Sequence, residues 1–350
     1  MNGYIDKTKI RGISIEKLDL EVLRTSDAIY NITDDTQYYM VEDAKHKEQY
    51  ILLDRLTIKD DDISFRLDYR KNKGVKNYYT ELDLTIKTKK SKDVNNVVAL
   101  TSDQQITKLK EIKEYLRFRY GVYIDFKDSR YYYIELNKTR QMEHDFNSYR
   151  HIFHAIVEQR NKNKYRKFAS LTSGGYEDKE IIYLSSKVET LKLYNKSKQM
   201  WDCFKISIDN NMLRLEYVLN GYEKISDKLG TSKVTELTDD SIKQFIDNEI
   251  KEDVFNSVEK EITEENKVLK KVYSDLKKTR RCYIKDFCSY CNKKGVNLFS
   301  IEQIYDIAES DIKRNMKNYS RQKKLIDNTI IDDIKNNMTL YEEFKTKFSS

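Results

Sequence analysis

The sequence of 350 residues contains no proline, nine glycines, four cysteines, four histidines and one tryptophan. Four cysteines in a chain of this length do not form a disulfide framework. No apolar run reaches the length of a membrane span, and residues 1–20 are charged throughout and lack the apolar core of a signal peptide. We therefore expect a soluble, cytoplasmic protein. The absence of proline, beside abundant Lys, Ile, Asn, Tyr and Asp, indicates an AT-rich bacterial or phage genome and says nothing about the fold.

The charge balance is nearly even, with 65 basic and 58 acidic residues and a formal net charge of +7. Such a small surplus does not by itself require a nucleic-acid partner, so any DNA-binding argument depends on where the charges lie. Hydrophobic residues make up only 39%, but 27 tyrosines and 13 phenylalanines supply large surfaces for burial. The length suffices for one large domain or two modest ones.

Alternation of apolar and polar residues marks short strands in the first part of the chain. Residues 63–69 and 78–87 alternate clearly, and with the turn at 71–76 they predict a β-hairpin. Weaker strand patterns occur at 13–18 and 49–56. These patterns indicate β-structure ahead of the first clear helix.

Helices and strands then alternate along the chain. Capping residues at 101–103 and apolar residues at helical spacing predict a helix that ends at Gly121. Residues 131–138 predict a strand and 146–159 a helix, followed by a basic run at 160–167. A turn at Ser173-Gly174-Gly175 then leads into a block of strands.

That block, residues 180–219, organises the rest of the sequence. Its alternation predicts strands at 181–185, 190–196 and 212–219, and the gap between the last two has room for another at 203–208. After residue 238 the pattern changes to long charged helical segments. We expect these helices at 242–258, 268–281, 301–316 and 319–336.

The sequence thus predicts an α+β fold, in which an antiparallel sheet carries helices packed on one face and a mostly helical C-terminal region follows. We divide the chain into a mixed N-terminal segment at 1–60, an α+β catalytic core at 61–232 and a helical region at 233–350.

The polar faces of the strands in the central block carry a set of residues suited to phosphodiester chemistry. Tyr194 shares the face of its strand with Lys192 and Lys196, and Arg214 and Glu216 share a face of the last strand. A phenol is a weak nucleophile at its usual pKa near ~10, but neighbouring cations and a metal that polarises the phosphate favour its attack.

A packing or surface role is the ordinary alternative for any one of 27 tyrosines. Two other tyrosines compete with Tyr194 as the nucleophile. Tyr217 falls on the apolar face of its strand, and Tyr222 falls on the helix expected after it.

Metal ligation has two candidate residue sets. Glu135 and Glu216 lie on the polar faces of separate strands, and hard cations such as Mg²⁺ prefer carboxylate oxygens; the alternative is that each pairs with a neighbouring Lys or Arg. His151 and His154 stand three apart on a helix, a spacing that also fits a structural role.

The cysteines offer only half of a zinc signature. Cys288 and Cys291 form one CxxC pair with Cys282 nearby, but no second pair or nearby histidine follows. Buried or surface thiols are therefore the default interpretation.

Basic residues concentrate in a few tracts. The run at 160–167 has five basic residues in eight, the segment 267–281 has seven basic residues against one acid, and 313–324 has six basic residues. Charged tracts are usually solvated helix faces, and contact with DNA phosphates is the second interpretation. The candidate DNA-binding residues are Arg160, Lys162, Lys164, Arg166, Lys167, Lys277, Lys278, Arg280 and Arg281.

The order of these motifs resembles a known family. The chain contains YYYIELNK, a helix, a glycine turn, IIYLSS, TLKLYNKSK and then MLRLEYVLNGYEKISDKLG. This order, over roughly residues 60–230, is similar to rolling-circle replication initiators, in particular the filamentous-phage gene II family and the plasmid Rep_trans initiators. The family's Tyr-x-Lys strand, Arg-x-Glu strand and Leu-Gly helix end fall on Tyr194-Asn195-Lys196, Arg214-Leu215-Glu216 and Leu229-Gly230, and its acidic strand residue falls on Glu135.

Two features depart from the family pattern. The spacer at 199–211 is short, and the histidine-hydrophobic-histidine motif that is frequent in nicking enzymes is missing, since two residues separate His151 from His154. These departures bear on the metal ligands rather than on the tyrosine.

The resemblance implies a rolling-circle Rep-like core and a metal-dependent tyrosine nickase. Tyr194 would attack an origin phosphodiester, leaving a 5′-phosphotyrosine link and a 3′-OH primer. Glu135 and Glu216 would hold Mg²⁺ or Mn²⁺, and Lys192, Lys196 and Arg214 would add positive charge. The implied partners are double- and single-stranded origin DNA, a host helicase and polymerase, and a second copy of the chain. A non-catalytic DNA-binding initiator or regulator and a conjugative relaxase are the alternatives.

Overall fold

The computed structural model divides the chain into two compact units that interleave along the sequence. Unit 1 comprises residues 1–138, 187–191 and 215–246, and unit 2 comprises 139–186, 192–214 and 247–350. The residues that the structure describes are 4–19, 22, 38–42, 49–53, 55–59, 63–68, 81–87, 99–163, 167–168, 181–208, 210–278 and 337–349.

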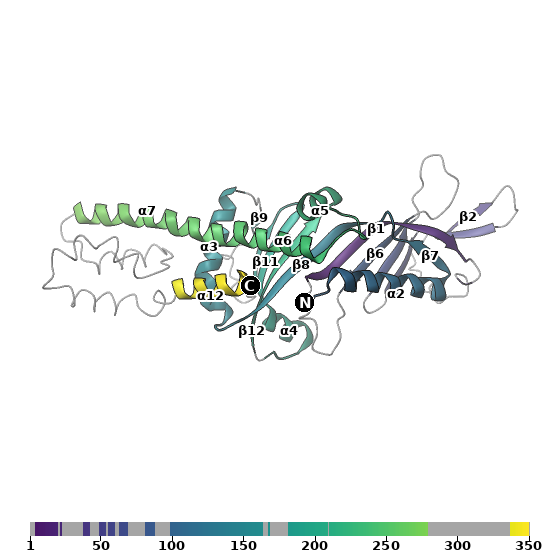
Figure 1. The fold of residues 1–350 in the computed structure, drawn as a ribbon, viewed down its shortest axis with the longest axis horizontal. Helices are drawn as coiled ribbons and strands as arrows, with labels where there is room; N and C mark the ends of the chain where they lie inside the picture. Colours follow the sequence, from purple (N-terminus) through teal and green to yellow (C-terminus); the bar gives the residue numbers. More distant parts are fainter. Residues whose placement is uncertain are drawn as a thin grey trace. The chain divides into compact units, whose positions relative to one another are not determined.

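A ten-stranded sheet runs in the order β4-β5-β6-β1-β8-β12-β11-β10-β9, with β7 also paired to β1 (Figure 1). Every pairing whose register is described is antiparallel, and β2 and β3 form a separate two-stranded sheet. The strands are β1 (Ile5–Leu18), β2 (Tyr38–Glu42), β3 (Gln49–Leu53), β4 (Arg55–Lys59), β5 (Ile63–Asp68), β6 (Glu81–Lys87), β7 (Val122–Asp125), β8 (Arg130–Met142), β9 (Lys167–Phe168), β10 (Ile181–Ser185), β11 (Glu189–Asn195) and β12 (Asn211–Asn220).

The helices complete an α+β fold, which confirms the predicted class. They are α2 (Ser102–Tyr120), the 3₁₀ helix η2 (Phe146–Tyr149), α3 (Arg150–Asn163), α4 (Lys196–Phe204), α5 (Tyr222–Leu229), α6 (Asp239–Glu249), the π-helix η3 (Ile250–Phe255), α7 (Asn256–Lys278) and α12 (Asn337–Ser349). No helix of the described part of the chain has the length and apolar character needed to cross a membrane.

Helix α2 packs on the part of the sheet that belongs to unit 1 (Figure 1). Its apolar stripe of Leu109, Ile112 and Leu116 is buried, because these side chains recur on one face of the helix. The buried amide of Gln105 donates a 2.7 Å hydrogen bond to the Thr8 hydroxyl of β1, which satisfies a polar pair inside this layer. A capping box at Thr101 begins the helix.

Strand β1 departs from regular alternation at several places. Its pairing with β6 shifts between Ile10 and Ile13, where Gly12 has a φ of 69°. A left-handed residue at a shift in register forms a β-bulge, which bends the strand and changes the face that each side chain reaches. A second shift, between Ile5 and Lys7 against β8, shapes the candidate site.

Hydrogen bonds between distant stretches of the sequence close unit 1. The amide of Tyr131 donates to the carbonyl of Ser232 at 2.8 Å, and that of Gly221 donates to the carbonyl of Tyr132 at 2.7 Å. The amide of Ser102, at the start of α2, donates to the Asp239 carboxylate at 2.7 Å. Strand β8 and helix α2 are therefore anchored by residues about a hundred positions later.

Unit 2 is built largely from α3, α7 and α12 around an aromatic core. The rings of Tyr149 and Phe344 lie 6.3 Å apart, and those of Phe344 and Phe348 stack at 4.7 Å. Helix α12 is also tied by polar contacts, since the Tyr149 hydroxyl donates to Glu343 at 2.6 Å and the side chain of Arg140 donates to the Lys347 carbonyl at 2.8 Å. The sequence patterns did not predict α12.

Several sequence-based boundaries agree with the structure. The hairpin of β5 and β6 is antiparallel, with Phe65 opposite Leu84. Helix α2 ends at Gly121, whose φ of 64° is the left-handed conformation expected of a helix-ending glycine. The strands expected at 131–138, 181–185 and 212–219 correspond to β8, β10 and β12.

Other expectations were wrong. The region with room for a strand at 203–208 begins with the end of α4. The segments 242–258 and 268–278 are helical as expected, but the break expected between them is absent, because α6, η3 and α7 follow one another directly. Residues 49–56 contain β3 and the start of β4, which belong to different sheets, rather than one strand. The turns at 71–76 and 173–175 and the helices expected at 301–316 and 319–336 lie outside the described residues.

Candidate functional site

Three carboxylates from three neighbouring strands meet in unit 1. Asp6 of β1, Glu135 of β8 and Glu216 of β12 each place a carboxylate oxygen within 4.8 Å of the other two. Glu216 is 4% exposed, and the side chain of Glu135 is 13% exposed. We call these three residues the carboxylate cluster. The sequence predicted that Glu135 and Glu216 would converge, and the structure brings them together.

Asp6 joins the cluster because β1 is irregular at that point. Ile5 pairs with Leu136 and Lys7 pairs with Glu135, so Asp6 is an extra residue without a partner position on β8. Both Asp6 and Lys7 consequently lie on the face of Glu135, as their contacts with its carboxylate show. In a regular strand Asp6 and Lys7 would point to opposite faces of the sheet. The sequence therefore did not indicate that Asp6 belongs to the carboxylate cluster.

Glu135 is held in place by two neighbours. The hydroxyl of Tyr133, two residues earlier on β8, donates a short hydrogen bond to Glu135 Oε1. The ammonium of Lys7 lies 3.8 Å from the same oxygen. One carboxylate oxygen is thereby engaged by protein groups.

The donor set of the carboxylate cluster fits a hard divalent cation. Mg²⁺ and Mn²⁺ take oxygen ligands, and one or two carboxylates beside waters or phosphate oxygens are their usual protein ligands. Three acids this close, one of them nearly buried, also repel one another unless a positive charge offsets them. Lys7 supplies one such charge and a bound cation would supply more.

Tyr194, the predicted nucleophile, lies in unit 2 at the end of a strand. It is the next-to-last residue of β11 and is 6% exposed. Its neighbours Leu191 and Leu193 are fully buried, as the alternation predicted. The prediction of an exposed polar face is wrong here, because Tyr194 is buried too.

Lys196 does not continue the strand as the sequence predicted. Asn195 caps a helix instead, its side chain accepting a 3.0 Å bond from the Lys198 amide, so Lys196 becomes the first residue of α4. The Lys196 side chain is 3% exposed, and its ammonium donates to Gln199 at 2.9 Å. Lys192 remains on β11 and is partly exposed.

Arg214 is almost completely buried, at 1% exposed. Its Nε donates a 2.8 Å hydrogen bond to the hydroxyl of Thr139 within unit 2. Tyr194, Lys192, Lys196 and Arg214 therefore belong to unit 2, whereas the carboxylate cluster belongs to unit 1.

The alternative metal ligands are His151 and His154, and His151 makes a polar contact with α12. His151 is 7% exposed, and its Nε2 lies 2.9 Å from the Asn337 carbonyl of α12. Burial lowers its pKa to about 4, so the imidazole is neutral at ordinary pH. Among the described residues, neither His151 nor His154 joins a group of three potential metal ligands.

The competing tyrosines differ sharply in exposure. Tyr217 is fully buried, with its ring 5.5 Å from that of Phe245, as its predicted apolar face requires. Tyr222 opens α5, is 37% exposed and lies 6.3 Å from the ring of Tyr132. Exposure alone therefore favours Tyr222 over Tyr217 as a reachable hydroxyl.

All nine candidate DNA-binding residues lie where the structure gives no side-chain description. Arg160 and Lys162 continue α3, Lys167 opens β9, and Lys277 and Lys278 end α7. Lys164, Arg166, Arg280 and Arg281, the tract at 313–324 and the cysteines Cys282, Cys288 and Cys291 lie outside the described residues. The DNA-binding assignment stays a prediction.

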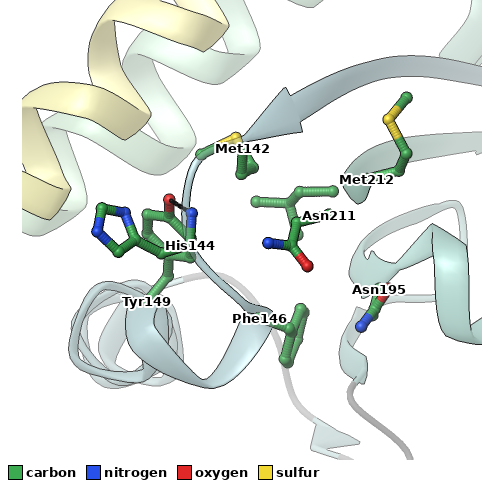
Figure 2. A pocket seen from close by; sticks show the side chains of 8 residues that line it. Met142, His144, Phe146, Tyr149, Asn195, Asn211 and Met212 are labelled. Atoms are coloured by element: carbon green, nitrogen blue, oxygen red, sulfur yellow. Dashed lines mark hydrogen bonds between the residues drawn. The ribbon is translucent and has the colours of Figure 1, made fainter. Parts of the chain in front are cut away.

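A small apolar hollow in unit 2 lies beside the residue that follows Tyr194. Figure 2 shows Phe146, Met142 and Met212 around it, with Asn195 at one side and the His144–Tyr149 pair at the other. Its volume of about 10 Å³ is close to what a single water molecule requires. The hollow is thus a packing defect between β8, η2 and β12, too small for a nucleotide.

Comparisons with known proteins find similarity in structure but no match in sequence. No protein-family model matches the chain, and no curated protein matches it. Among solved structures, the chain is similar to a rolling circle replication initiator protein from Geobacillus stearothermophilus. The identity is 11%, the match covers 71% of this chain and 83% of that one, and the TM-score is 0.33.

Proposed function

We propose that this chain is a replication initiation protein that nicks the origin of a plasmid or phage genome for rolling-circle replication. The phenolic oxygen of Tyr194 attacks one phosphorus atom of the origin strand, and the bond from phosphorus to the 3′-oxygen breaks. The tyrosine becomes linked to the 5′-phosphate, and the 3′-oxygen takes up a proton to become the 3′-OH primer. Attack by a 3′-OH on the phosphotyrosine reverses the step and ends the round.

The other residues have supporting roles in this proposal. Asp6, Glu135 and Glu216 would hold Mg²⁺ or Mn²⁺, which when bound neutralises charge on the phosphate. Lys192, Lys196 and Arg214 add positive charge near Tyr194. Origin DNA is contacted by the basic residues from Arg160 to Lys167 and from Lys277 to Arg281. The protein acts in the cytoplasm, and its further partners are a host helicase, a polymerase and a second copy of the chain.

The carboxylate cluster is the observation that carries the proposal. Glu135 and Glu216 lie 81 positions apart in the sequence, on strands whose motifs resemble those of the nicking initiators. Their oxygens nevertheless approach within 4.8 Å. A protein that only recognised an origin would gain nothing from crowding three acids on a surface that must approach phosphates.

A non-catalytic origin-binding initiator or regulator is the second candidate. The burial of Tyr194, Lys196 and Arg214 favours it, because side chains that are 6%, 3% and 1% exposed are often structural. A conjugative relaxase would share the chemistry of the first proposal and differ in its partners.

Covalent trapping tests the proposal. The protein is incubated with Mn²⁺ and the supercoiled replicon DNA, relaxation is followed on a gel, and the peptide that carries DNA is mapped by mass spectrometry. We expect an adduct on Tyr194 that is lost in Tyr194→Phe, a change that keeps the buried ring and hence the fold. Tyr222→Phe, on the half-exposed tyrosine of α5, is the control and should retain cleavage.

Two results would contradict this assignment. An adduct on Tyr222 or Tyr217 would show that the nucleophile is wrong. Tight origin binding by the wild type without any cleavage would support the non-catalytic candidate.

A further inference from the structure

A row of cations and tyrosines extends along one face of unit 1 from the carboxylate cluster. Lys7, Lys9 and Arg11 alternate along β1, and Tyr132 and Tyr133 belong to β8, which pairs with β1. All five side chains are partly exposed. We call these residues the cation–tyrosine row.

The cations lie over the rings. The Arg11 guanidinium carbon is 3.6 Å from the centre of the Tyr132 ring, and the ammonium groups of Lys9 and Lys7 are 5.0 and 5.1 Å from the centre of the Tyr133 ring. These separations are within the range of cation–π attraction. The ring of Tyr222 on α5 extends the aromatic surface, 6.3 Å from Tyr132.

An irregularity of β8 places both tyrosines on this face. Lys9 pairs with Tyr133 and Ile10 pairs with Tyr131, so Tyr132 is an extra residue of the ladder. The ammonium of Lys9 lies 6.0 Å from the Tyr132 ring and 5.0 Å from the Tyr133 ring. Two consecutive residues of a regular strand would point to opposite faces, so the bulge creates the paired aromatic surface.

The opposite face of the same strands forms the core. Ile5, Thr8 and Ile10 of β1 are buried, as are Tyr131 and Ile134 of β8. The row is consequently fixed to a rigid layer of the sheet rather than to a loop. At the end of the row nearest the carboxylate cluster, the ammonium of Lys7 lies 3.8 Å from the Glu135 carboxylate.

We propose that the cation–tyrosine row binds a single strand of DNA, with bases stacked on Tyr132 and Tyr133 and phosphates against Lys9 and Arg11. Proteins that bind single strands combine aromatic side chains, on which any base can stack, with cations that follow the backbone. A duplex hides the faces of its bases and cannot use the rings in this way. The choice of DNA rests on the proposed function, and the direction of the row leads the strand toward the carboxylate cluster.

Equilibrium binding to a labelled oligothymidine, measured by fluorescence anisotropy in EDTA with the full chain, tests the row. Replacing both rings, in Tyr132→Leu/Tyr133→Leu, should weaken binding about tenfold or more, since each stacked base contributes roughly 1–3 kcal/mol. Tyr132→Phe/Tyr133→Phe keeps the rings and should restore binding, which separates stacking from misfolding. Lys9→Gln/Arg11→Gln should reduce the slope of log affinity against log salt by about 1.4.

The chain offers a matched control outside the row. Lys17 lies 5.3 Å from the ring of Tyr123, a similar cation–tyrosine pair on β1 and β7. Lys17→Gln/Tyr123→Leu should change affinity less than about twofold, well below the effect of losing a stacked base. An equal loss in this control, or unchanged affinity in Tyr132→Leu/Tyr133→Leu, would overturn the proposal.

Competing ligands distinguish the remaining explanations. Inorganic polyphosphate carries charge without bases, so the double leucine variant should bind it as the wild type does. An equal loss of polyphosphate or duplex binding would refute base stacking, and tighter binding of an RNA strand would assign the row to RNA. Because EDTA removes metal and prevents cleavage, a failure here is independent of whether Tyr194 nicks DNA.

Discussion

At the scale of single residues, the carboxylate cluster combines acids of β8 and β12 with Asp6, which lies at the bulge in β1. Glu135 and Glu216 alternate with apolar residues in the sequence, so the sequence indicated both acids, although the structure buries Glu216. Asp6 could not be identified from the sequence, because the bulge that turns it toward Glu135 is defined only by the pairing of β1 with β8. The burial of Tyr194 was equally hidden, because consecutive residues of β11, which point to opposite faces, are buried.

The carboxylate cluster predicts that Asp6 contributes to metal binding. Asp6→Asn keeps the shape of the side chain but removes a negative oxygen, so the affinity for Mn²⁺ should fall roughly tenfold or more. Isothermal titration of Mn²⁺ into wild type and variant measures the change. Asp227→Asn, an exposed acid on α5 outside the cluster, is the matched control. Equal affinity in wild type and Asp6→Asn would remove Asp6 from the site.

Glu265 on α7 predicts a pH dependence of stability. Burial, with a smaller contribution from Glu261, raises its pKa to about 8, from 4.5 in the unfolded chain. The folded protein therefore holds a proton that the unfolded chain releases, and stability falls as pH rises from about 4.5 through 8. Each unit of pKa difference corresponds to about 1.4 kcal/mol. Glu265→Gln should therefore stabilise the protein by several kcal/mol near pH 8 and hardly at all near pH 4.5.

Urea denaturation of wild type and Glu265→Gln at both pH values checks this expectation. Glu158→Gln on α3, whose side chain is exposed, provides the control and should leave stability unchanged at either pH. A stabilisation by Glu265→Gln that does not vary with pH would show that the buried carboxyl is not the titrating group.

At the scale of elements, most helices and strands of the core followed from local patterns, and the β11–α4 junction did not. The alternation of residues 190–196 favours a strand that includes Lys196. The structure ends the strand at Asn195, whose side chain caps α4, while the hydroxyl of Ser197 accepts a 3.0 Å bond from the Met212 amide. Asparagine is a favoured N-cap residue, but Asn195 lies within an uninterrupted strand pattern, so the pattern alone did not indicate a cap there.

Gly121, the residue that ends α2, predicts a local steric limit. Its φ is 64°, and a Cβ added there would lie 2.7 Å from Asp19 Cβ and 2.8 Å from the Asp19 carbonyl oxygen. Gly121→Ala therefore combines the cost of a left-handed residue, about 1 kcal/mol, with a clash against backbone. We expect a loss of stability of about 3 kcal/mol in urea denaturation.

Gly230, which ends α5, allows the cost of the left-handed conformation to be measured separately from the cost of the clash. Its φ is 80°, but nothing in the described part of the chain lies within 4 Å of an added Cβ. Gly230→Ala should consequently lose only the left-handed cost of about 1 kcal/mol. Equal losses at Gly121 and Gly230 would mean that Asp19 moves aside and that the close approach is not a constraint.

At the scale of the whole molecule, the two units are not continuous pieces of the chain. Each of the strands β8, β11 and β12 contributes residues to both, so the sequence crosses between the units several times. Local patterns identify elements but carry no signal for such an arrangement, because it depends on pairings between residues far apart. The predicted segments 1–60, 61–232 and 233–350 followed changes in composition and remain predictions.

The interleaving predicts how fragments of the chain behave. Residues 1–138 contain α2 and β1 but lack the partners of Tyr131, Tyr132 and Ser102, which lie between residues 221 and 239. Buried backbone groups without partners are costly, so this fragment should not hold β8 against β1. A fragment of residues 1–246 contains all three stretches of unit 1 and serves as the control. Hydrogen exchange should show slow amides in α2 and β1 for 1–246 and for the full chain, and fast exchange for 1–138. Equal protection in both fragments would mean that the first 138 residues fold on their own, and that the long-range hydrogen bonds add nothing to their stability.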